Sequence, residues 1–150
     1  MEINNLTPVE EYDGLLYKRD DSFLPFGKYG TSGGKVRQAI SLIGKNVDNI
    51  RENHKNTIVT HTQVHSTTGT ILTRVAKHYN IKCIVCVGGT TPKSLKKHHM
   101  MMLAEHWGGH IRNVCGHGMH APVMNRLRKL VKQEKYFNAV FSDNIGLYPE

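Results

Sequence analysis

The stretch "GTSGGKVRQA", residues 30–39, places two glycines directly before Lys35, at the start of a segment with helical spacing. Glycine-rich turns before helices often receive phosphate, because free backbone N–H groups point outward there. Lys35 therefore has two candidate roles: it holds a phosphate as a point charge, or it forms a covalent bond to a cofactor. The nucleotide-binding phosphate loop requires G-x-x-x-x-G-K-[ST], whereas Val36 follows the lysine here and Tyr29 occupies the first glycine position. The sequence therefore argues against a nucleotide-binding loop.

A second polar loop, "HSTTG" at residues 65–69, lies between an expected strand and an expected helix. The hydroxyls of Ser66, Thr67 and Thr68, together with free N–H groups at the start of the helix, suit an anionic ligand. The same hydroxyls also suit a helix N-cap, which needs no ligand. The residues alone leave both interpretations open.

The elements that must position these loops follow from the apolar pattern. We expect strands at 15–21, 56–61, 81–89 and 110–116, helices at 35–45, 67–80, 91–109 and 120–136, and a short apolar run at 137–141. Such alternation predicts a single α/β domain over residues 1–150, with an open, mostly parallel twisted sheet and helices on both faces. Ligands of such sheets lie beyond the carboxyl ends of the strands, which directs attention to the loops at 20–34, 61–69, 88–91 and 115–120.

Composition limits the function classes. The chain has 20 basic and 12 acidic side chains and a formal charge of +8, which favours an anionic partner. No run of eighteen apolar residues is present, and the N-terminus is polar and acidic, so we expect neither a membrane span nor a secretory signal. An odd count of three cysteines, two of them in an apolar strand-like run, predicts a reducing, cytoplasmic setting.

The ten histidines invite a metal hypothesis, which their spacing does not support. Cys115, His117 and His120 could meet a zinc ion, but no paired C-x₂-C and H-x₃-H set exists. Cys83 and Cys86 have the two-residue spacing but occupy an expected strand, where positions three apart face opposite ways. We therefore predict no metal site.

Nucleic-acid binding is the alternative from another class. Two expected helices carry a basic set of side chains: Lys93, Lys96, Lys97, His98, His99, Arg126, Arg128, Lys129, Lys132 and Lys135. No nucleic-acid-binding motif accompanies them and aromatic residues are sparse there, so solvated helix faces explain most of this charge. The alternative function is therefore that of a non-catalytic basic α/β domain that binds nucleic acid or a protein partner.

Two motifs taken together resemble a known family. "YKRDD" at 17–21, followed by "GGKVRQAISLI" at 33–43, resembles the start of the fold-type II pyridoxal-phosphate enzymes, the tryptophan synthase β-like superfamily. Within that superfamily the sequence is most similar to the branch of aminocyclopropane-carboxylate deaminase and D-cysteine desulfhydrase. The segments at 60–89 and 90–111 fit the strand, loop and helix order that follows, so the resemblance covers nearly the whole chain.

The resemblance implies a lyase or deaminase that uses pyridoxal 5'-phosphate on a small amino acid. Lys35 is then the Schiff-base lysine, which forms the aldimine. Its place at a helix start, near Arg37, agrees, because both features disfavour the ammonium form and only the neutral amine attacks an aldehyde. The other implied cofactor contacts are Gly34, His65, Thr67 and Thr68, and the implied substrate contacts are Ser66, Thr67, Thr68 and Gly69. The family commonly has Asn or Gln in the middle of this loop, where His65 or Thr67 stands here.

Fold-type II enzymes are longer than this chain, and their C-terminal half supplies a Gly/Ser-rich cup for the cofactor phosphate. This sequence has no such cup, since "CVGGTTPK" falls at the end of a middle strand. The chain thus resembles the N-terminal half of such an enzyme. We therefore expect either a homo-oligomer or assembly with a separately encoded C-terminal half.

Overall fold

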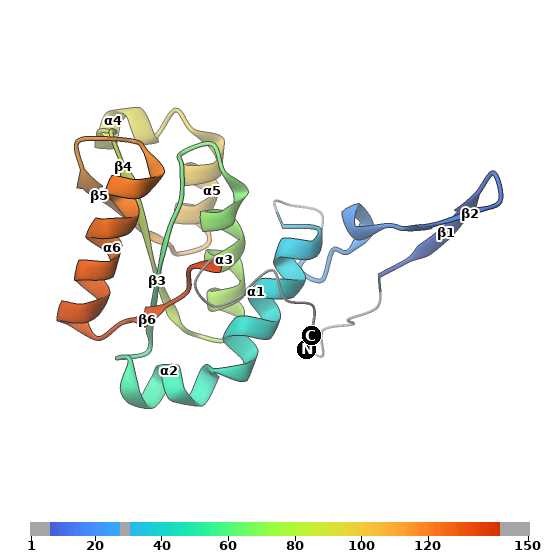
Figure 1. Ribbon diagram of the computed structural model, residues 1–150, viewed down its shortest axis with the longest axis horizontal. Coiled ribbons are helices and arrows are strands. Elements are labelled where there is room, and N and C mark those ends of the chain that lie inside the picture. The colour runs from blue at the N-terminus through green and yellow to red at the C-terminus, as the bar shows by residue number, and fades with distance from the viewer. Residues whose placement is uncertain (1–6, 28–30, 142–150) are drawn as a thin grey trace.

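A computed structural model describes residues 7–27 and 31–141 of the chain; residues 28–30, which include Tyr29 and the first glycine of "GTSGGK", lie outside them. Its main sheet is fully parallel, with the strand order β5-β4-β3-β6 (Figure 1). The strands are β3 (Thr57–His61), β4 (Lys82–Gly88), β5 (His110–Cys115) and β6 (Phe137–Asn138). The predicted open parallel sheet is confirmed, and β6 forms within the expected apolar run at 137–141.

The central strand β4 is buried from its second residue onward, as its continuous apolar run predicts. Cys83 belongs to the core on one face of the sheet and Cys86 to the core on the other face, as strand alternation requires. Burial raises the pKa of both thiols to about 12, because the apolar surroundings disfavour the thiolate.

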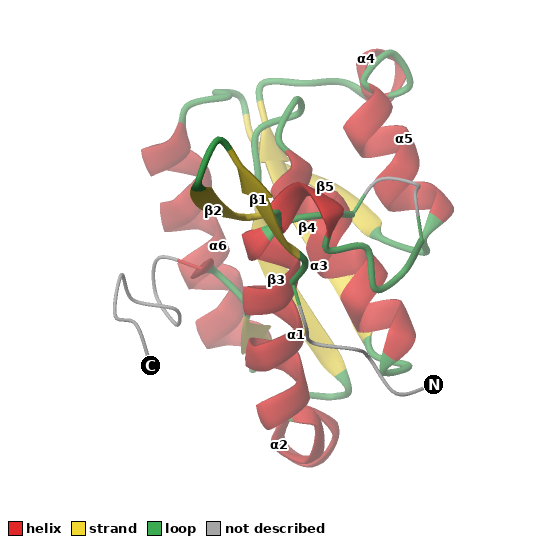
Figure 2. Cartoon of the chain, turned by 90° about the vertical axis from the view of Figure 1, so that its right-hand side faces the viewer, coloured by secondary structure: helices red, strands yellow, loops and turns green. Residues whose placement is uncertain are grey.

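Helices cover both faces of the sheet, as predicted. The helix α6 (His120–Glu134) packs on one face, and α1 (Gly34–Lys45), α3 (Thr67–His78) and α5 (His99–His106) form the layer on the other (Figures 1 and 2). A short helix that the sequence did not predict, α2 (Val47–Asn53), follows α1 and buries Ile50. Within the described ranges, no helix is both long and apolar enough to cross a membrane.

The helix predicted at 91–109 is wrong as a single element. It is divided into α4 (Pro92–Leu95) and α5 (His99–His106), with His98 in an extended conformation between them. Leu95 and Met101 are both buried in the same core. Six residues of continuous helix would turn the second side chain by roughly 240° relative to the first. The break lets both side chains reach the core.

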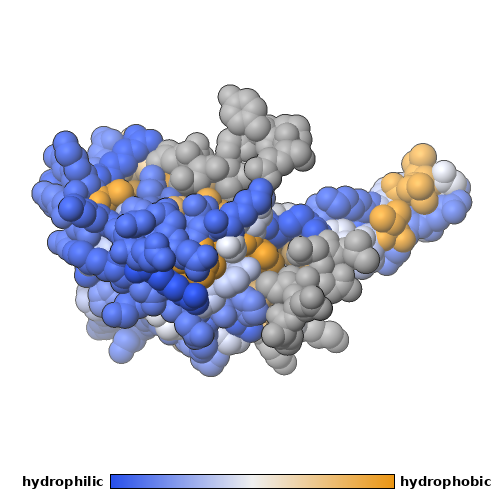
Figure 3. All heavy atoms as spheres, turned by 90° about the horizontal axis from the view of Figure 1, so that it is seen from below, coloured by the Kyte–Doolittle hydropathy of each residue, from blue (hydrophilic) through white to orange (hydrophobic). Residues whose placement is uncertain are grey.

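The N-terminal region does not join the main sheet. The strand predicted at 15–21 is shorter: β2 (Leu15–Lys18) pairs antiparallel with β1 (Val9–Tyr12), and a 3₁₀ turn, η1 (Asp20–Ser22), follows. This hairpin projects from the body of the molecule and is nearest the viewer in Figure 2. It exposes a set of apolar side chains that we call the arm patch: Val9, Tyr12, Leu15, Leu16 and Tyr17. Figure 3 shows apolar residues in orange on the projecting arm.

Candidate functional site

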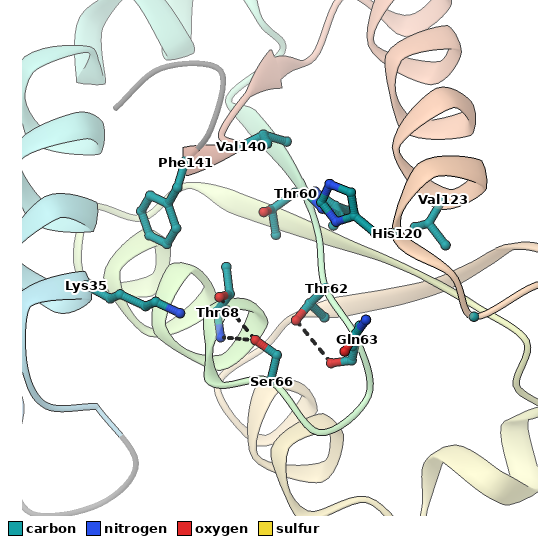
Figure 4. Close-up of a pocket in the computed structure, with 12 residues that line it drawn as sticks. Lys35, Thr60, Thr62, Gln63, Ser66, Thr68, His120, Val123, Val140 and Phe141 are labelled. Atoms are coloured by element: carbon teal, nitrogen blue, oxygen red, sulfur yellow. Dashed lines mark hydrogen bonds between the residues drawn. The ribbon is translucent and has the colours of Figure 1, made fainter. Parts of the chain in front are cut away.

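Three helices, α1, α3 and α6, begin around one pocket at the carboxyl end of β3 (Figure 4). The arrangement follows from the parallel topology, which brings strand ends and the starts of the following helices to one edge of the sheet. The pocket has a volume of about 320 Å³. Its lining residues are Lys35, Thr60, His61, Thr62, Gln63, Ser66, Thr68, Gly118, His120, Val123, Val140 and Phe141.

Lys35 is the second residue of α1, and its side chain extends into the pocket toward Ser66 and Thr68 (Figure 4). The residue before the helix is Gly33, whose φ of 88° is a conformation that side chains with a Cβ rarely adopt. The glycine turn therefore sets the direction in which α1 begins. Arg37 does not line the pocket, since its guanidinium lies over the Phe23 ring and donates to the Thr7 hydroxyl.

The "KRDD" residues lie beside this turn without lining the pocket. Arg19 binds the Asp21 carboxylate through two N–H groups at 2.9 and 2.7 Å and also binds Glu10, and it lowers the pKa of Asp21. A Cβ atom built on Gly34 would lie 3.7 Å from Oδ2 of Asp20. The Asp20 carboxylate thus lies beside the start of α1, outside the set of residues that line the pocket.

Ser66 is the N-cap of α3, and its hydroxyl accepts a hydrogen bond from the Thr68 N–H at 3.3 Å. The same hydroxyl donates to Oγ1 of Thr68 at 3.2 Å. Both side chains also line the pocket, so the N-cap and the ligand interpretations of this loop are compatible. Thr67 begins α3 outside the lining set, and Gly69 is buried where a Cβ would lie 2.9 Å from Cγ1 of Val85.

The structure does not bring His65 into the Lys35 pocket. His65 lines a neighbouring cavity of about 260 Å³, where its ring lies edge-on to that of His98 with the centroids 4.6 Å apart. Gln63 and Gly118 line both cavities, so the two adjoin.

Several residues of the pocket were missed by sequence reasoning. Thr60 is fully buried at the end of β3, and its Oγ1 has no hydrogen-bond partner among the described residues. His61 and His120 share a hydrogen bond, Nε2 to Nδ1, of 3.0 Å. From the sequence, His120 is considered only as a metal ligand. The parallel topology directs attention to four loops, and two of them, 61–69 and 115–120, supply lining residues together with Lys35, so the signal for His120 lies in the topology rather than in the residue type.

The charged lining residue of the pocket is basic. None of the described lining residues is acidic, and Lys35 supplies a positive charge. Elsewhere among residues 7–27 and 31–141, no group of three or more His, Cys, Asp or Glu side chains comes together as a metal site would require. The described pocket is therefore suited to an anion.

No protein-family model matches the sequence. A curated relative, the O-seryl-dTMP PLP-dependent decarboxylase of Salmonella phage ViI, is 30% identical over an alignment of 125 residues that covers 80% of this chain. The chain spans only 28% of that relative's length.

Two solved structures share the architecture. O-ureido-L-serine synthase is 22% identical, with a TM-score of 0.58 over 80% of this chain and 34% of its own. Cysteine synthase from Entamoeba histolytica is 15% identical, with a TM-score of 0.57 over 92% of this chain and 40% of its own. The aminocyclopropane-carboxylate deaminase branch stays a prediction. The chain has the α/β fold of the fold-type II pyridoxal-phosphate enzymes that its sequence resembles.

Proposed function

We propose that this chain is the part of a pyridoxal-phosphate-dependent enzyme that carries the cofactor lysine, Lys35, and the loop for the substrate carboxylate at 66–69. Its reaction would be lyase or deaminase chemistry on a small amino acid. The observation that supports the proposal most is the Lys35 side chain in a pocket surrounded by the starts of three helices and by hydroxyl groups.

The pocket residues fit this cofactor in charge and in shape. Lysine, hydroxyl and imidazole groups line it, and none of the described lining residues carries a carboxylate. Val123, Val140 and Phe141 are the larger apolar side chains of the lining. Phe141 lies on the Lys35 side of the pocket, where a flat aromatic ring can lie against it (Figure 4). The buried Thr60 hydroxyl, which lacks a partner among the described residues, is a donor that a ligand would satisfy.

Each residue then has a defined task. The Lys35 amine binds the cofactor covalently and moves the proton at the substrate α-carbon, where the cofactor supplies an electron sink. Ser66, Thr68 and the first N–H groups of α3 hold the substrate carboxylate, which would accept the hydrogen bond that Ser66 now donates to Thr68. The resemblance implies further contacts: Gly34, His65 and Thr67 would lie against the cofactor, and Thr67 and Gly69 against the substrate.

The substrate we propose is an amino acid borne on an anionic carrier. The phage relative is named for O-seryl-dTMP, in which serine is joined to a nucleotide, and decarboxylation is a lyase reaction. The formal charge of +8 on this chain supports an anionic carrier.

We also propose that a further protein segment completes the enzyme. The chain covers 28% of the phage relative and 34% of O-ureido-L-serine synthase, so most of such an enzyme lies outside the aligned part. The arm patch supplies exposed apolar area that a further segment could cover. A segment corresponding to the remainder of the relative is the proposed occupant, and self-association is the competing outcome.

Borohydride reduction with pyridoxal phosphate tests the function. We expect an absorbance band on mixing and, after reduction, a mass adduct on the peptide that contains Lys35. Lys35→Ala should abolish the adduct, whereas Lys93→Ala, at another exposed lysine in a first helical turn, should retain it. An adduct on other lysines, or none even with the completing segment present, would reject the proposal in favour of a non-catalytic basic domain.

A further inference from the structure

A groove between β5 and α6 lies outside the site described above. The strand β5 is at one edge of the sheet, and α6 packs beside it (Figure 1). The cavity between them has a volume of about 430 Å³. We call it the edge groove, and its lining consists of three cationic side chains, two amides and two apolar side chains: Arg112, Arg126, Lys129, Asn113, Gln133, Val114 and Leu130.

The positions of the two elements explain why these side chains meet. Arg112 lies beside Cys86 of β4 in the parallel register, so it projects from the face of the sheet on which α6 packs. On α6, Arg126, Lys129 and Gln133 recur at spacings of three and four residues and therefore share one side of the helix. A strand and a helix thus bring their cations to the same groove.

The three cations of the edge groove have no acidic partner in the described part of the chain. Among residues 7–27 and 31–141, no carboxylate forms a salt bridge with Arg112, Arg126 or Lys129, and none of the lining residues is acidic. In contrast, Lys55 pairs with Glu134 of the same helix at 3.3 Å. Like charges gathered in one groove repel one another, so an anion bound among them is stabilised by all three.

The edge groove differs from a solvated helix face. On the sequence alone, the charge of α6 is explained by solvent, but Arg112 belongs to a strand and is half-buried. Val114 and Leu130 pack against the core and supply apolar surface between the cations. The groove therefore offers an anionic ligand a partly apolar floor as well as positive charge.

The shape of the edge groove favours a chain of anionic groups over a single one. Its lining residues on α6 run from Arg126 to Gln133, roughly 10 Å along the helix axis. A single phosphate is too small to contact this whole row, whereas a nucleic acid strand presents a charge at every nucleotide. None of the described lining residues is aromatic, so base stacking contributes little and contacts with the backbone dominate.

We propose that the edge groove binds the sugar–phosphate backbone of a nucleic acid strand. The inference rests on the proposed function for its choice of partner, because the substrate amino acid is there borne on an anionic carrier, and a nucleic acid strand is such a carrier. The helix α6 lines both sites, with Val123 at the Lys35 pocket and Arg126 at the edge groove, three residues apart. The strand is thus held by the helix that also forms a wall of the pocket.

Paired charge neutralisations test the edge groove. The probe is a labelled oligothymidylate, titrated by fluorescence anisotropy at several salt concentrations. Arg126→Gln combined with Lys129→Gln should make the slope of log K against log salt shallower by about 1.4, since each lost phosphate contact removes about 0.7. Failure of the original chain to bind the probe at low salt would overturn the proposal.

The control is Lys93→Gln combined with Lys132→Gln. This pair removes the same charge from exposed positions outside the edge groove, and it should keep the original slope. All four substituted side chains are exposed, so both double variants should unfold in denaturant as the original chain does. Equal slopes in the two double variants would overturn the proposal, because net charge alone would then explain the binding.

Other polymers identify the kind of polyanion. Oligothymidylate and oligodeoxyadenylate should bind with similar affinity, because contacts with the backbone carry no sequence information. Polyglutamate of matched charge should compete more weakly than either. Stronger competition by polyglutamate would contradict the proposal and identify an acidic protein segment as the partner.

The Lys35 adduct separates this inference from the proposed function. The double variant at Arg126 and Lys129 should form the adduct with pyridoxal phosphate as the original chain does, because neither residue lines that pocket. An unchanged salt slope in this variant, with the adduct retained, would reject the edge groove alone. The expected change in slope without any Lys35 adduct in the original chain would support the edge groove and reject the proposed function.

Discussion

A Cβ atom on Gly88 would lie 1.9 Å from the carbonyl oxygen of His117, so the end of β4 and the loop before α6 meet backbone to backbone. Gly89 adds to this contact, since its Cβ would lie 2.6 Å from the nitrogen of Gly118. The two glycines at the end of β4 therefore serve packing, and they fix the place where α6 begins and where His120 reaches the pocket.

Gly88→Ala should destabilise the chain by at least about 1–3 kcal/mol, because the overlap is with backbone that no side-chain rotation can relieve. Denaturant unfolding measures this loss. Gly116→Ala is the control in the same loop, since a Cβ there would meet nothing within 4 Å, and it should change stability little. Equal stability of the two variants would show that the loop does not pack on β4 as described.

Ser66→Ala should remove the N-cap of α3 and lower the free energy of unfolding by about 1 kcal/mol. The reason is the lost acceptor for the Thr68 N–H. Ser66→Asp should restore most of the stability, because aspartate also caps helices, but it should weaken binding of an anionic substrate in the pocket. Ser41→Ala, at an exposed position inside α1, is the control and should have a small effect. A Ser66→Asp variant that binds substrate carboxylate normally would contradict the role of this loop.

The fold was predictable where one segment alone decided its conformation. The run at 81–89 is apolar throughout and gave β4, and the periodic spacing of Ile71, Leu72, Val75 and Ala76 gave α3. The hairpin was missed although it had a signal: Asp13-Gly14 is a typical two-residue hairpin turn, and both residues have positive φ, 51° and 73°. The break at 96–98 has no glycine or proline to indicate it, because tertiary packing of Leu95 and Met101 imposes it.

The candidate site was predictable in part for a similar reason. Lys35, Ser66 and Thr68 stand in motifs with a local pattern, and the structure places all three around one pocket. Thr60 and His120 come from separate βα units and line one pocket only because of the order of strands in the sheet. The spacing of residues along the sequence does not show that Thr60 and His120 line the same pocket. The predicted parallel topology indicates only which loops lie at the same edge of the sheet.

The thiols should differ sharply in reactivity. The raised pKa of Cys83 and Cys86, about 12 through burial, keeps both protonated and inaccessible, so neither should react with a disulfide reagent at about pH 8 in the folded chain. Cys115 is only partly buried and should react first. Mass mapping of the labelled peptides measures the order, and denaturant should release the other two. Rapid labelling of Cys83 or Cys86 without denaturant would contradict the described core.

The raised pKa of Cys83 and Cys86 also predicts how the free energy of unfolding changes with pH. A thiol whose pKa is raised on folding keeps its proton when the unfolded chain has lost it, so the folded state binds more protons above the ordinary value of 9.0. The contribution of these two thiols is therefore complete below about pH 9 and should be lost progressively toward about pH 12. Unfolding in denaturant across this range should show the fall, and Cys83→Ala should make it shallower. A stability that stays constant or rises over this range would contradict burial of the neutral thiols.

The arm patch should control association rather than folding. Leu16 is 75% exposed on a hairpin whose strands are exposed at every residue, so Leu16→Ser should change the stability of the isolated chain by no more than about 0.5 kcal/mol. In a mixture with a chain that corresponds to the remainder of the phage relative, the variant should associate at least roughly tenfold more weakly, because an apolar contact is lost. Sedimentation velocity measures both samples.

Glu11→Gln, at the position paired with Leu16 across the hairpin, removes no apolar area and is the control. Equal association of Leu16→Ser and the original chain would exclude the arm from the interface. Self-association of the chain without the second segment would instead identify a homo-oligomer as its partner.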